Sequence, residues 1–340
     1  MAFTFPPSLK LALTPTPFIL LERLSQQLTG PRIWIKRDDL TGSLLSGNKV
    51  RKLNYVVAHA LANQCDTLIT CGGTQSNHCR ATALVGAQLG LNVCLILRED
   101  NAGDLDGNLL LDELSGADIH IYTRQEYFKS LPALFAQWDK YYRNAGCKPV
   151  QIPTGASDEI GVWGYIEASQ ELVQDIQRNN ISPKHIYTAT GSGGTQAGLT
   201  AGMHLFGSDA QVVGIAVCDS EQYFQNKVRA DLTSWQRYYD VKIQLDNLSV
   251  QVNANYIGPG YAKADPEVFA TIKQLAQTEG IVLDPVYTGK AFHGLLSEIK
   301  RGSHAGENDI VFIHTGGLFG LFAQKQQLQS ALNLRPDNGR

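Results

Sequence analysis

The stretch Ser46-Gly47-Asn48-Lys49-Val50-Arg51-Lys52-Leu53 joins a glycine turn to the first residues of an apolar-periodic helix. Lys49 therefore lies near a helix N-terminus, and a second cation, Lys52, follows one turn later. A helix N-terminus, a nearby cation and burial all disfavour the ammonium form of a lysine. The stretch thus suits an amine nucleophile, whereas a solvated lysine is the simpler interpretation of Lys49 taken in isolation.

Short β-rich runs alternate with helical segments along the rest of the chain. After Lys49, and again over 158–179 and 265–279, apolar residues recur with the period of a helix. This alternation predicts an α/β fold with open, twisted, mostly parallel sheets that helices cover on both faces. The expected strands are 32–36, 67–70, 92–97, 118–122, 185–189, 211–217 and 309–314, and the expected apolar face of the helix after Lys49 is Val50, Leu53, Val56, Val57, Ala60 and Leu61.

Three of the expected strands end in glycine-rich polar turns, Cys71-Gly72-Gly73, Thr190 to Thr195, and His314-Thr315-Gly316-Gly317. Ligands of open α/β sheets bind beyond the carboxyl ends of the strands, where such turns gather. A turn at Pro153-Thr154-Gly155, followed by a long helical segment, marks a crossing between domains. We therefore expect a larger domain made of 1–49 and 161–340, with a smaller α/β domain, 50–160, inserted into it.

The turn Thr190-Gly191-Ser192-Gly193-Gly194-Thr195-Gln196 follows a strand and opens a helix. Successive backbone N–H groups and the Ser192 and Thr195 hydroxyls there form an anion-binding nest. A nucleotide-binding oxidoreductase would need G-x-G-x-x-G, but Gln196 occupies the third glycine position. We favour a single-phosphate site over that alternative and over a tight turn without a ligand. A buried reactive lysine beside such a loop suggests a Schiff base to pyridoxal phosphate.

Further polar residues stand at other turns. Gln75-Ser76-Asn77-His78 offers hydroxyl and amide groups at a strand-to-helix turn, and helix capping would use one of them but not all. Tyr261 ends the rigid turn Gly258-Pro259-Gly260, and Tyr287 belongs to Asp284-Pro285-Val286-Tyr287-Thr288-Gly289-Lys290. Packing plus one hydrogen bond is the ordinary role of a buried tyrosine. His78 and His314 would equally serve as satisfied turn histidines.

Composition excludes several classes of protein. The 340 residues carry a net charge of -3, so no basic face indicates nucleic acid or an anionic membrane as a partner. No apolar run approaches the ~20 residues that span a bilayer. The six cysteines and eight histidines show no metal-ligand spacing, so we predict no metal. The N-terminal residues lack the order of a secretory signal, which predicts a cytoplasmic protein.

Taken together, these motifs resemble those of the D-cysteine desulfhydrase / 1-aminocyclopropane-1-carboxylate deaminase family. Its members are pyridoxal-phosphate enzymes with the tryptophan-synthase-β-like fold, fold type II. The resemblance extends from about residue 15 to about residue 322, and the motifs occur in the expected order. It implies a small amino acid as substrate, a homodimer and no obligate metal. The matching segments are Gly47-Asn48-Lys49, Gln75 to His78, Gly191 to Thr195, Asp284 to Lys290 and His314 to Gly317.

The resemblance also implies a role for each matching position. Lys49 would carry the Schiff base and move the α-proton of the substrate. Lys52 and the 191–195 loop would hold the cofactor phosphate. Asn77 would hydrogen-bond the pyridine 3-oxygen, and Thr315 would face the pyridine nitrogen. The implied catalytic residues are Lys49, Ser76, Tyr261 and Tyr287, and the implied substrate contacts are Gln75, Ser76, Asn77 and Thr288.

Two positions bear on the substrate. In the similar family, members that act on the cyclopropane substrate have a glutamate directly after the tyrosine that matches Tyr287, and a leucine in the later glycine turn. This chain has Thr288 and Thr315 at these two positions. A threonine hydroxyl stabilises a neutral pyridine, a weaker electron sink that suits expulsion of a β-substituent. We therefore expect D-cysteine to give pyruvate, ammonia and hydrogen sulfide. The open alternatives are 1-aminocyclopropane-1-carboxylate deaminase, a lyase of another amino acid such as cysteate, and a protein that binds the cofactor without turnover.

Overall fold

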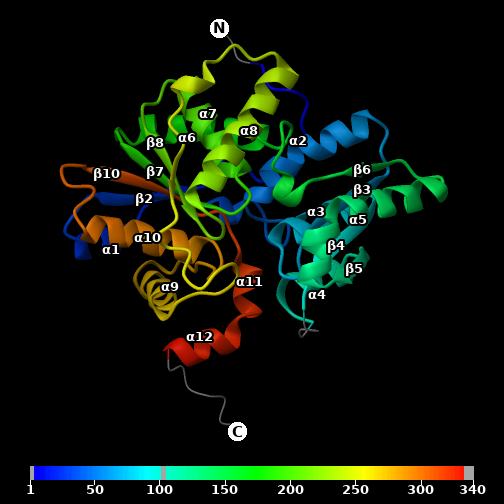
Figure 1. Ribbon diagram of the computed structural model, residues 1–340. Coiled ribbons are helices and arrows are strands. Elements are labelled where there is room, and N and C mark those ends of the chain that lie inside the picture. Colours follow the sequence, from blue (N-terminus) through cyan, green and yellow to red (C-terminus); the bar gives the residue numbers. More distant parts are fainter. Residues whose placement is uncertain (1–3, 101–104, 333–340) are drawn as a thin grey trace.

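Two sheets organise the chain, and Figure 1 shows them side by side, with α2 (Asn48–Ala62) near their junction. The computed structural model describes residues 4–100 and 105–332. None of the helices in these two ranges combines the length and the apolarity that a membrane span requires.

The larger sheet has the strand order β1-β2-β10-β7-β8-β9. β1 pairs with β2 in antiparallel orientation at one edge, and every other pair of neighbours is parallel. The carboxyl ends of β2, β10, β7 and β8 therefore lie at the same edge of the sheet. The strands are β1 (Phe18–Leu20), β2 (Arg32–Lys36), β7 (His185–Thr190), β8 (Gln211–Ala216), β9 (Gln251–Asn253) and β10 (Asp309–Ile313).

Successive side chains of the larger sheet face opposite helical layers, as the two-residue period of a strand requires. Ile33 and Ile35 of β2 pack with α1, α9 and α10, whereas Trp34 packs with α6 and α7. Figure 1 shows the first layer below the sheet and the second above it. The bounds of these helices are α1 (Glu22–Gln27), α6 (Trp163–Arg178), α7 (Gly194–Leu205), α8 (Glu221–Tyr239), α9 (Pro266–Glu279), α10 (Thr288–Lys300) and α12 (Lys325–Leu332), and the 3-10 turns are η1 (Asp38–Leu40) and η3 (Leu245–Asn247).

The smaller sheet has the order β5-β4-β3-β6, and all its pairs are parallel. Leu68 and Leu95 pack with α2 and α3 on one face, whereas Ile69 and Ile96 pack with α5 on the other. After β10 the chain returns through α11 to contact α4 of this part. The elements are β3 (Thr67–Gly73), β4 (Asn92–Arg98), β5 (Asp118–Tyr122), β6 (Pro149–Gln151), α3 (Asn77–Leu89), α4 (Gly107–Leu114), α5 (Arg124–Asn144), η2 (Thr154–Ala156) and α11 (Leu318–Phe322).

The predicted α/β architecture is confirmed, and all seven expected strands are present. Sequence analysis misses the three-residue strands β1, β6 and β9, because so short a segment carries no period and is a strand only through its partner. It expects Leu61 on the apolar face, but Leu61 is 38% exposed, next to the last residue of α2. The smaller sheet spans 67–151, within the expected inserted domain of 50–160, but the boundaries of that domain stay a prediction.

Candidate active site

Tight packing between two turns fixes the start of α2. Gly47 precedes the helix with a φ of 91°, a backbone conformation that favours glycine. A Cβ on Gly47 would lie 2.9 Å from the carbonyl oxygen of Thr315, and the backbone N–H of Asn48 donates to that same oxygen over 3.0 Å. The turn after β10 therefore sets the position from which Lys49, the second residue of α2, extends.

The amine of Lys49 is held by weak contacts with neutral groups. Its Nζ lies 3.4 Å from the carbonyl oxygen of Gly155 and 3.5 Å from Oγ of Ser192. Burial lowers the pKa of Lys49 to about 8, and no carboxylate among the described residues forms an ion pair with it. An appreciable fraction of this amine is therefore neutral near physiological pH, as nucleophilic and base chemistry requires.

Lys52 reinforces this unusual electrostatic environment. Its side chain is fully buried, and Nζ donates to the Gly155 carbonyl and to Oγ of Ser157, each over 3.1 Å. Burial, and then the charge of Lys49, lowers the pKa of Lys52 well below its ordinary value. Two buried amines thus share the oxygen of Gly155 without a direct carboxylate partner, which is the arrangement that a bound anion would stabilise.

The glycine loop closes the same space from the side of the larger sheet. α7 begins at Gly194 without a side-chain cap, and the Gly194 N–H donates to Oγ of Ser157 over 3.2 Å. A Cβ on Gly194 would lie 2.7 Å from both Nζ of Lys52 and Oγ of Ser157. The residues therefore fit a phosphate group, because an uncapped helix N-terminus, two hydroxyls and uncompensated amines converge there. Asn48 joins this arrangement by donating to Oγ1 of Thr195 over 3.0 Å.

Gln196 explains why this loop differs from a dinucleotide-binding loop. Its side chain is fully buried, lies against Gly214 of β8 and donates to the Gln251 carbonyl of β9 over 2.6 Å. The position of the third glycine is thus used for packing within the sheet.

The polar turn after β3 is partly structural. Ser76 is the N-cap of α3, since its Oγ accepts from the Cys79 N–H over 3.2 Å. Oδ1 of Asn77 accepts from Nδ2 of Asn108 over 3.1 Å. Both amide atoms of Gln75 are engaged at the start of α4, with the Asn108 N–H at 2.9 Å and the Asp106 carbonyl at 2.9 Å. Contacts of these side chains with substrate or cofactor stay predictions, and Gln75 would have to exchange its present partners.

Asp284 organises the turn that carries Tyr287 and Thr288. Its carboxylate accepts from the backbone N–H groups of Val286, Tyr287 and Thr288 and from Oγ1 of Thr288, over 2.7 to 2.9 Å. Thr288 is fully buried, and its hydroxyl also accepts from the Asp284 N–H. A direct substrate contact for Thr288 stays a prediction that this geometry does not favour.

The two predicted tyrosines meet beside the glycine loop. The hydroxyls of Tyr261 and Tyr287 are 2.5 Å apart, and a Cβ on Gly191 would lie 3.1 Å from the Tyr287 ring. Burial raises the pKa of both phenols. Lys290, the third residue of α10, donates to the carbonyls of Ile257 and Gly260 and so fixes the turn before Tyr261. Both tyrosines are thereby held from the N-terminal end of one helix.

Arg98, at the end of β4, completes the site from the smaller sheet. Its guanidinium lies 5.4 Å from the ring centre of Tyr261, and 5.0 and 5.2 Å from those of Tyr127 and Phe128. Such distances allow cation–π attraction. The described residues offer it aromatic rings and no carboxylate ion pair.

The two turn histidines have mainly structural partners. His314 lies 3.1 Å from the Val282 carbonyl, and its Nδ1 accepts from the Gly316 N–H over 3.3 Å. His78 lies 2.8 Å from Oγ1 of Thr70, while its buried Nδ1 has no partner among the described residues. Burial lowers the pKa of both imidazoles, so both are neutral at physiological pH.

The sequence predicts one site that contains Lys49, Lys52, the glycine loop and the two tyrosines. The structure places all of them around one space. Sequence analysis misses Ser157, Arg98 and Asn108, which contact the site from segments distant in the sequence. An Arg at the carboxyl end of a strand was the one signal that could have found Arg98.

A family model described as pyridoxal-phosphate dependent enzyme matches residues 9–316. A putative 1-aminocyclopropane-1-carboxylate deaminase of Thermotoga maritima is 42% identical over 94% of this chain and 98% of its own length. A bifunctional D-cysteine desulfhydrase/1-aminocyclopropane-1-carboxylate deaminase of Arabidopsis thaliana, described as mitochondrial, is 40% identical over 95% of this chain and 81% of its own. A D-cysteine desulfhydrase of Klebsiella pneumoniae is 38% identical over 95% and 97%.

Solved structures give the same picture. A crystal structure of an ACC deaminase homologue superimposes with a TM-score of 0.87 at 35% identity, and it covers 96% of each chain. An O-ureido-L-serine synthase shares the fold alone, with a TM-score of 0.67 at 15% identity over 99% of this chain and 98% of its own.

Proposed function

Because the chain belongs to the pyridoxal-phosphate-dependent enzymes, we propose that it is a lyase that eliminates the β-substituent of a small amino acid, with D-cysteine as substrate. One molecule each of D-cysteine and water would give pyruvate, ammonia and hydrogen sulfide. The observation that carries the chemistry is Lys49, a buried amine whose pKa is lowered to about 8 and which lies beside an uncompensated anion site.

Lys49 is the base in this proposal. When bound, pyridoxal phosphate withdraws electrons from the α-carbon of an amino acid and makes its α-proton acidic. The neutral Nζ of Lys49 takes that proton. The electrons of the broken C–H bond form a double bond between Cα and Cβ, and the electrons of the Cβ–S bond leave with sulfur. The unsaturated product takes up water to give pyruvate and ammonia.

Tyr261 and Tyr287 would assist the departure of the leaving group by hydrogen bonding. Because burial raises the pKa of both phenols, each remains protonated at physiological pH and is a hydrogen-bond donor, not a phenolate base. One phenol donates to the other over 2.5 Å. The hydroxyl that accepts in this pair keeps its own proton free, and we assign to it a hydrogen bond that stabilises the negative charge of the departing thiolate.

Thr315 supports elimination over ring opening. It is 7% exposed, and its carbonyl is bonded to the N–H of Asn48 beside Lys49. A hydroxyl is able to donate to a neutral ring nitrogen, whereas a carboxylate would favour a protonated one.

Product analysis tests this proposal. The purified enzyme is given D-cysteine, L-cysteine, cysteate, serine or 1-aminocyclopropane-1-carboxylate, and sulfide, pyruvate and 2-oxobutanoate are measured. We expect equal amounts of sulfide and pyruvate from D-cysteine and far less from L-cysteine. Turnover of the cyclopropane acid to 2-oxobutanoate without sulfide release from D-cysteine would overturn the assignment.

Deamination of 1-aminocyclopropane-1-carboxylate is a second candidate, favoured by the names of the relatives that are 40% and 42% identical. Thr315→Leu tests it, because this change removes the hydroxyl while Lys49 stays in place. If elimination is the native activity, the ratio of sulfide release to ring opening falls in the variant. Thr288→Glu is less informative, since it would bury a second carboxylate beside Asp284.

We also propose that the enzyme works in the cytoplasm, as the order of its N-terminal residues predicts, and that it is a homodimer, as the family resemblance implies. Light scattering of the purified protein tests the assembly. A mass of twice the 37.2 kDa of one chain is expected.

A further inference from the structure

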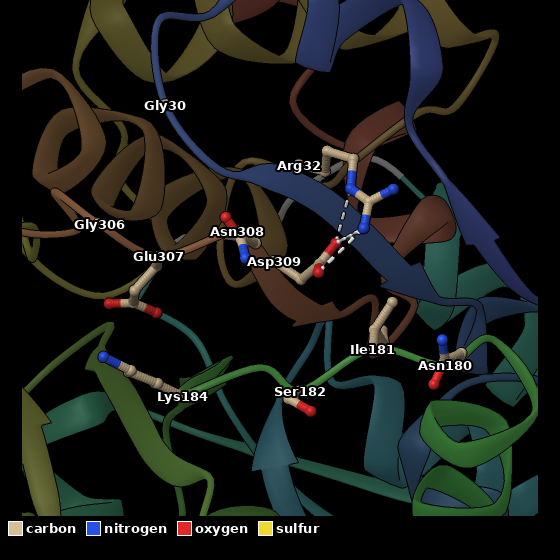
Figure 2. Close-up of a pocket in the computed structure, with 10 residues that line it drawn as sticks. All are labelled: Gly30, Arg32, Asn180, Ile181, Ser182, Lys184, Gly306, Glu307, Asn308 and Asp309. Atoms are coloured by element: carbon tan, nitrogen blue, oxygen red, sulfur yellow. Dashed lines mark hydrogen bonds and ion pairs between the residues drawn. The ribbon is translucent and has the colours of Figure 1, made fainter.

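A cavity of about 570 Å³ lies at the opposite end of the larger sheet from the active site. Residues at the amino ends of β2, β7 and β10 line it, whereas the active-site turns follow the carboxyl ends. Figure 2 shows the Glu307 side chain at one end of this cavity, away from the paired Arg32 and Asp309.

Glu307 binds two histidines with one oxygen. Its Oε1 lies 2.9 Å from Nδ1 of His185 and 2.8 Å from Nδ1 of His304. His185 is the first residue of β7, while His304 and Glu307 lie in the turn between α10 and β10. Two neighbouring strands therefore hold two imidazole nitrogens and a carboxylate within 4.8 Å of one another.

The second oxygen of this carboxylate is unsatisfied. The Glu307 side chain is 6% exposed, yet its buried Oε2 has no hydrogen-bond partner among the described residues. An ionised carboxylate oxygen without a donor is costly in the protein interior. Hydrogen bonds from the two imidazoles alone thus leave the cluster incomplete.

The remaining nitrogen of His304 has the partner that a metal-binding imidazole requires. Nε2 of His304 lies 2.8 Å from the hydroxyl of Tyr187, a buried residue of β7. Histidines that bind metals through one nitrogen donate the other N–H to an oxygen acceptor, which fixes the ring. With a metal ion bound, Nε2 of His304 would donate to the Tyr187 hydroxyl, and Nδ1 would exchange its hydrogen bond with Glu307 for a bond to the cation.

The geometry points to a site for a divalent transition-metal ion, of which Zn²⁺ is the prototype, held by His185, His304 and Glu307 and completed by water from the cavity. Two imidazoles and one carboxylate are an established ligand set for such ions. Metal–ligand bonds of about 2.0–2.2 Å place tetrahedral ligand atoms about 3.3 Å apart. The present separations of 2.8 and 2.9 Å need to widen by only a few tenths of an ångström. The ion would join β7 to the turn before β10.

A second cluster, Cys94, Asp118 and His120, provides an internal control. Its carboxylate already accepts from the Tyr142 hydroxyl over 2.7 Å, and its imidazole is stacked on Trp138 with ring centres 3.5 Å apart. We expect this cluster to take no metal.

Metal titration of the cofactor-loaded enzyme tests the proposal. Protein stripped with a chelator and freed of excess cofactor is titrated with Zn²⁺ by calorimetry and with Co²⁺ by visible absorbance. We expect one equivalent to bind, with a cobalt spectrum that has no thiolate charge-transfer band. Glu307→Gln and His185→Ala should abolish binding, and Tyr187→Phe should weaken it about 10- to 100-fold. His120→Ala should leave it unchanged.

The absorbance of the bound cofactor and the circular dichroism of each variant verify its fold. His185→Ala serves if Glu307→Gln does not fold, because His185 is 25% exposed and its loss is the milder change. Absence of stoichiometric binding to the wild type would overturn the proposal. Binding that survives both substitutions, or a thiolate-type cobalt spectrum, would do the same.

Discussion

The two faces of the first turn of α2 surround their buried cations with opposite kinds of partner, carboxylates on one face and neutral oxygens on the other. On one face, the guanidinium of Arg51 donates to Asp38 over 2.8 and 2.9 Å and to Glu171 over 3.0 Å, and these carboxylates raise its pKa. On the other face, Lys49 has only neutral oxygens nearby, and burial lowers its pKa to about 8.

The difference separates structure from chemistry within one helical turn. A buried cation with carboxylate partners keeps its charge and holds α2 against η1 and α6. A buried cation without them gives up its proton easily and suits reaction or anion binding. Burial alone therefore does not identify a functional lysine, and the absence of an ion-paired carboxylate marks Lys49 and Lys52 only together with their position at the glycine loop.

Loss of the Lys49 amine is the largest effect that we expect. Lys49→Ala removes the base, so turnover should fall by about 100- to 10,000-fold, the usual contribution of a positioned base. The absorbance band produced by covalent attachment of the cofactor to a lysine should disappear as well. Steady-state kinetics and a visible spectrum check both. A variant that keeps this band would show that another amine holds the cofactor.

Removal of Arg51 should act on stability. Arg51→Met leaves the buried carboxylate of Asp38 without its cation, whereas Glu171 keeps its ion pair with Lys36. Breaking a buried pair such as Arg51–Asp38 costs about 3–5 kcal/mol of unfolding free energy. Urea denaturation of the variant measures this loss. Arg143→Met is the matched control, because Arg143 is 55% exposed in its pair with Asp139 and should cost less than about 1 kcal/mol. Equal losses in the two variants would contradict the structural role of Arg51.

The sequence predicts one side of this comparison better than the other. The glycine turn before Lys49 and the loop at 190–195 are local patterns, so they mark the reactive face. The partners of Arg51 come from residues 38 and 171, which only folding brings together. The same limit hid Ser157 from sequence analysis, whereas Arg98 had a local signal in its position at the end of a strand. It also hid the cluster of His185, His304 and Glu307, because its ligands show no local spacing.

The strands and their ends were more accessible to sequence analysis. β2 and β5 have the expected bounds because each is a short run limited by turns. The roles of Gln75 and Thr288 show where motif matching is insufficient, since hydrogen bonds with Asp106, Asn108 and Asp284 already engage these side chains.

Lys52 tests whether the uncompensated face binds an anion. Lys52→Met removes a charged donor from the phosphate site, and a hydrogen bond to a charged group contributes about 1.5–3 kcal/mol. The affinity of the cofactor-free protein for pyridoxal phosphate should therefore fall about 10- to 100-fold, as fluorescence titration would measure. Lys242→Met is the control, because Lys242 is 82% exposed in its pair with Asp240, and we expect a change of no more than about fivefold. Unchanged affinity in Lys52→Met would remove Lys52 from the site.

The pH dependence of cofactor uptake is the smallest effect and the most direct test of Lys49. Its pKa lies about 8, below the ordinary 10.5, so the neutral amine rises about tenfold per pH unit below that value and levels off above it. The rate at which cofactor-free protein takes up pyridoxal phosphate, followed by absorbance, should rise and saturate in the same way. Lys290 also has a pKa of about 8, so Lys49→Ala is measured in parallel and should show no such phase. A midpoint near 10.5 would mean that burial does not perturb Lys49, and the contrast with Arg51 would fail.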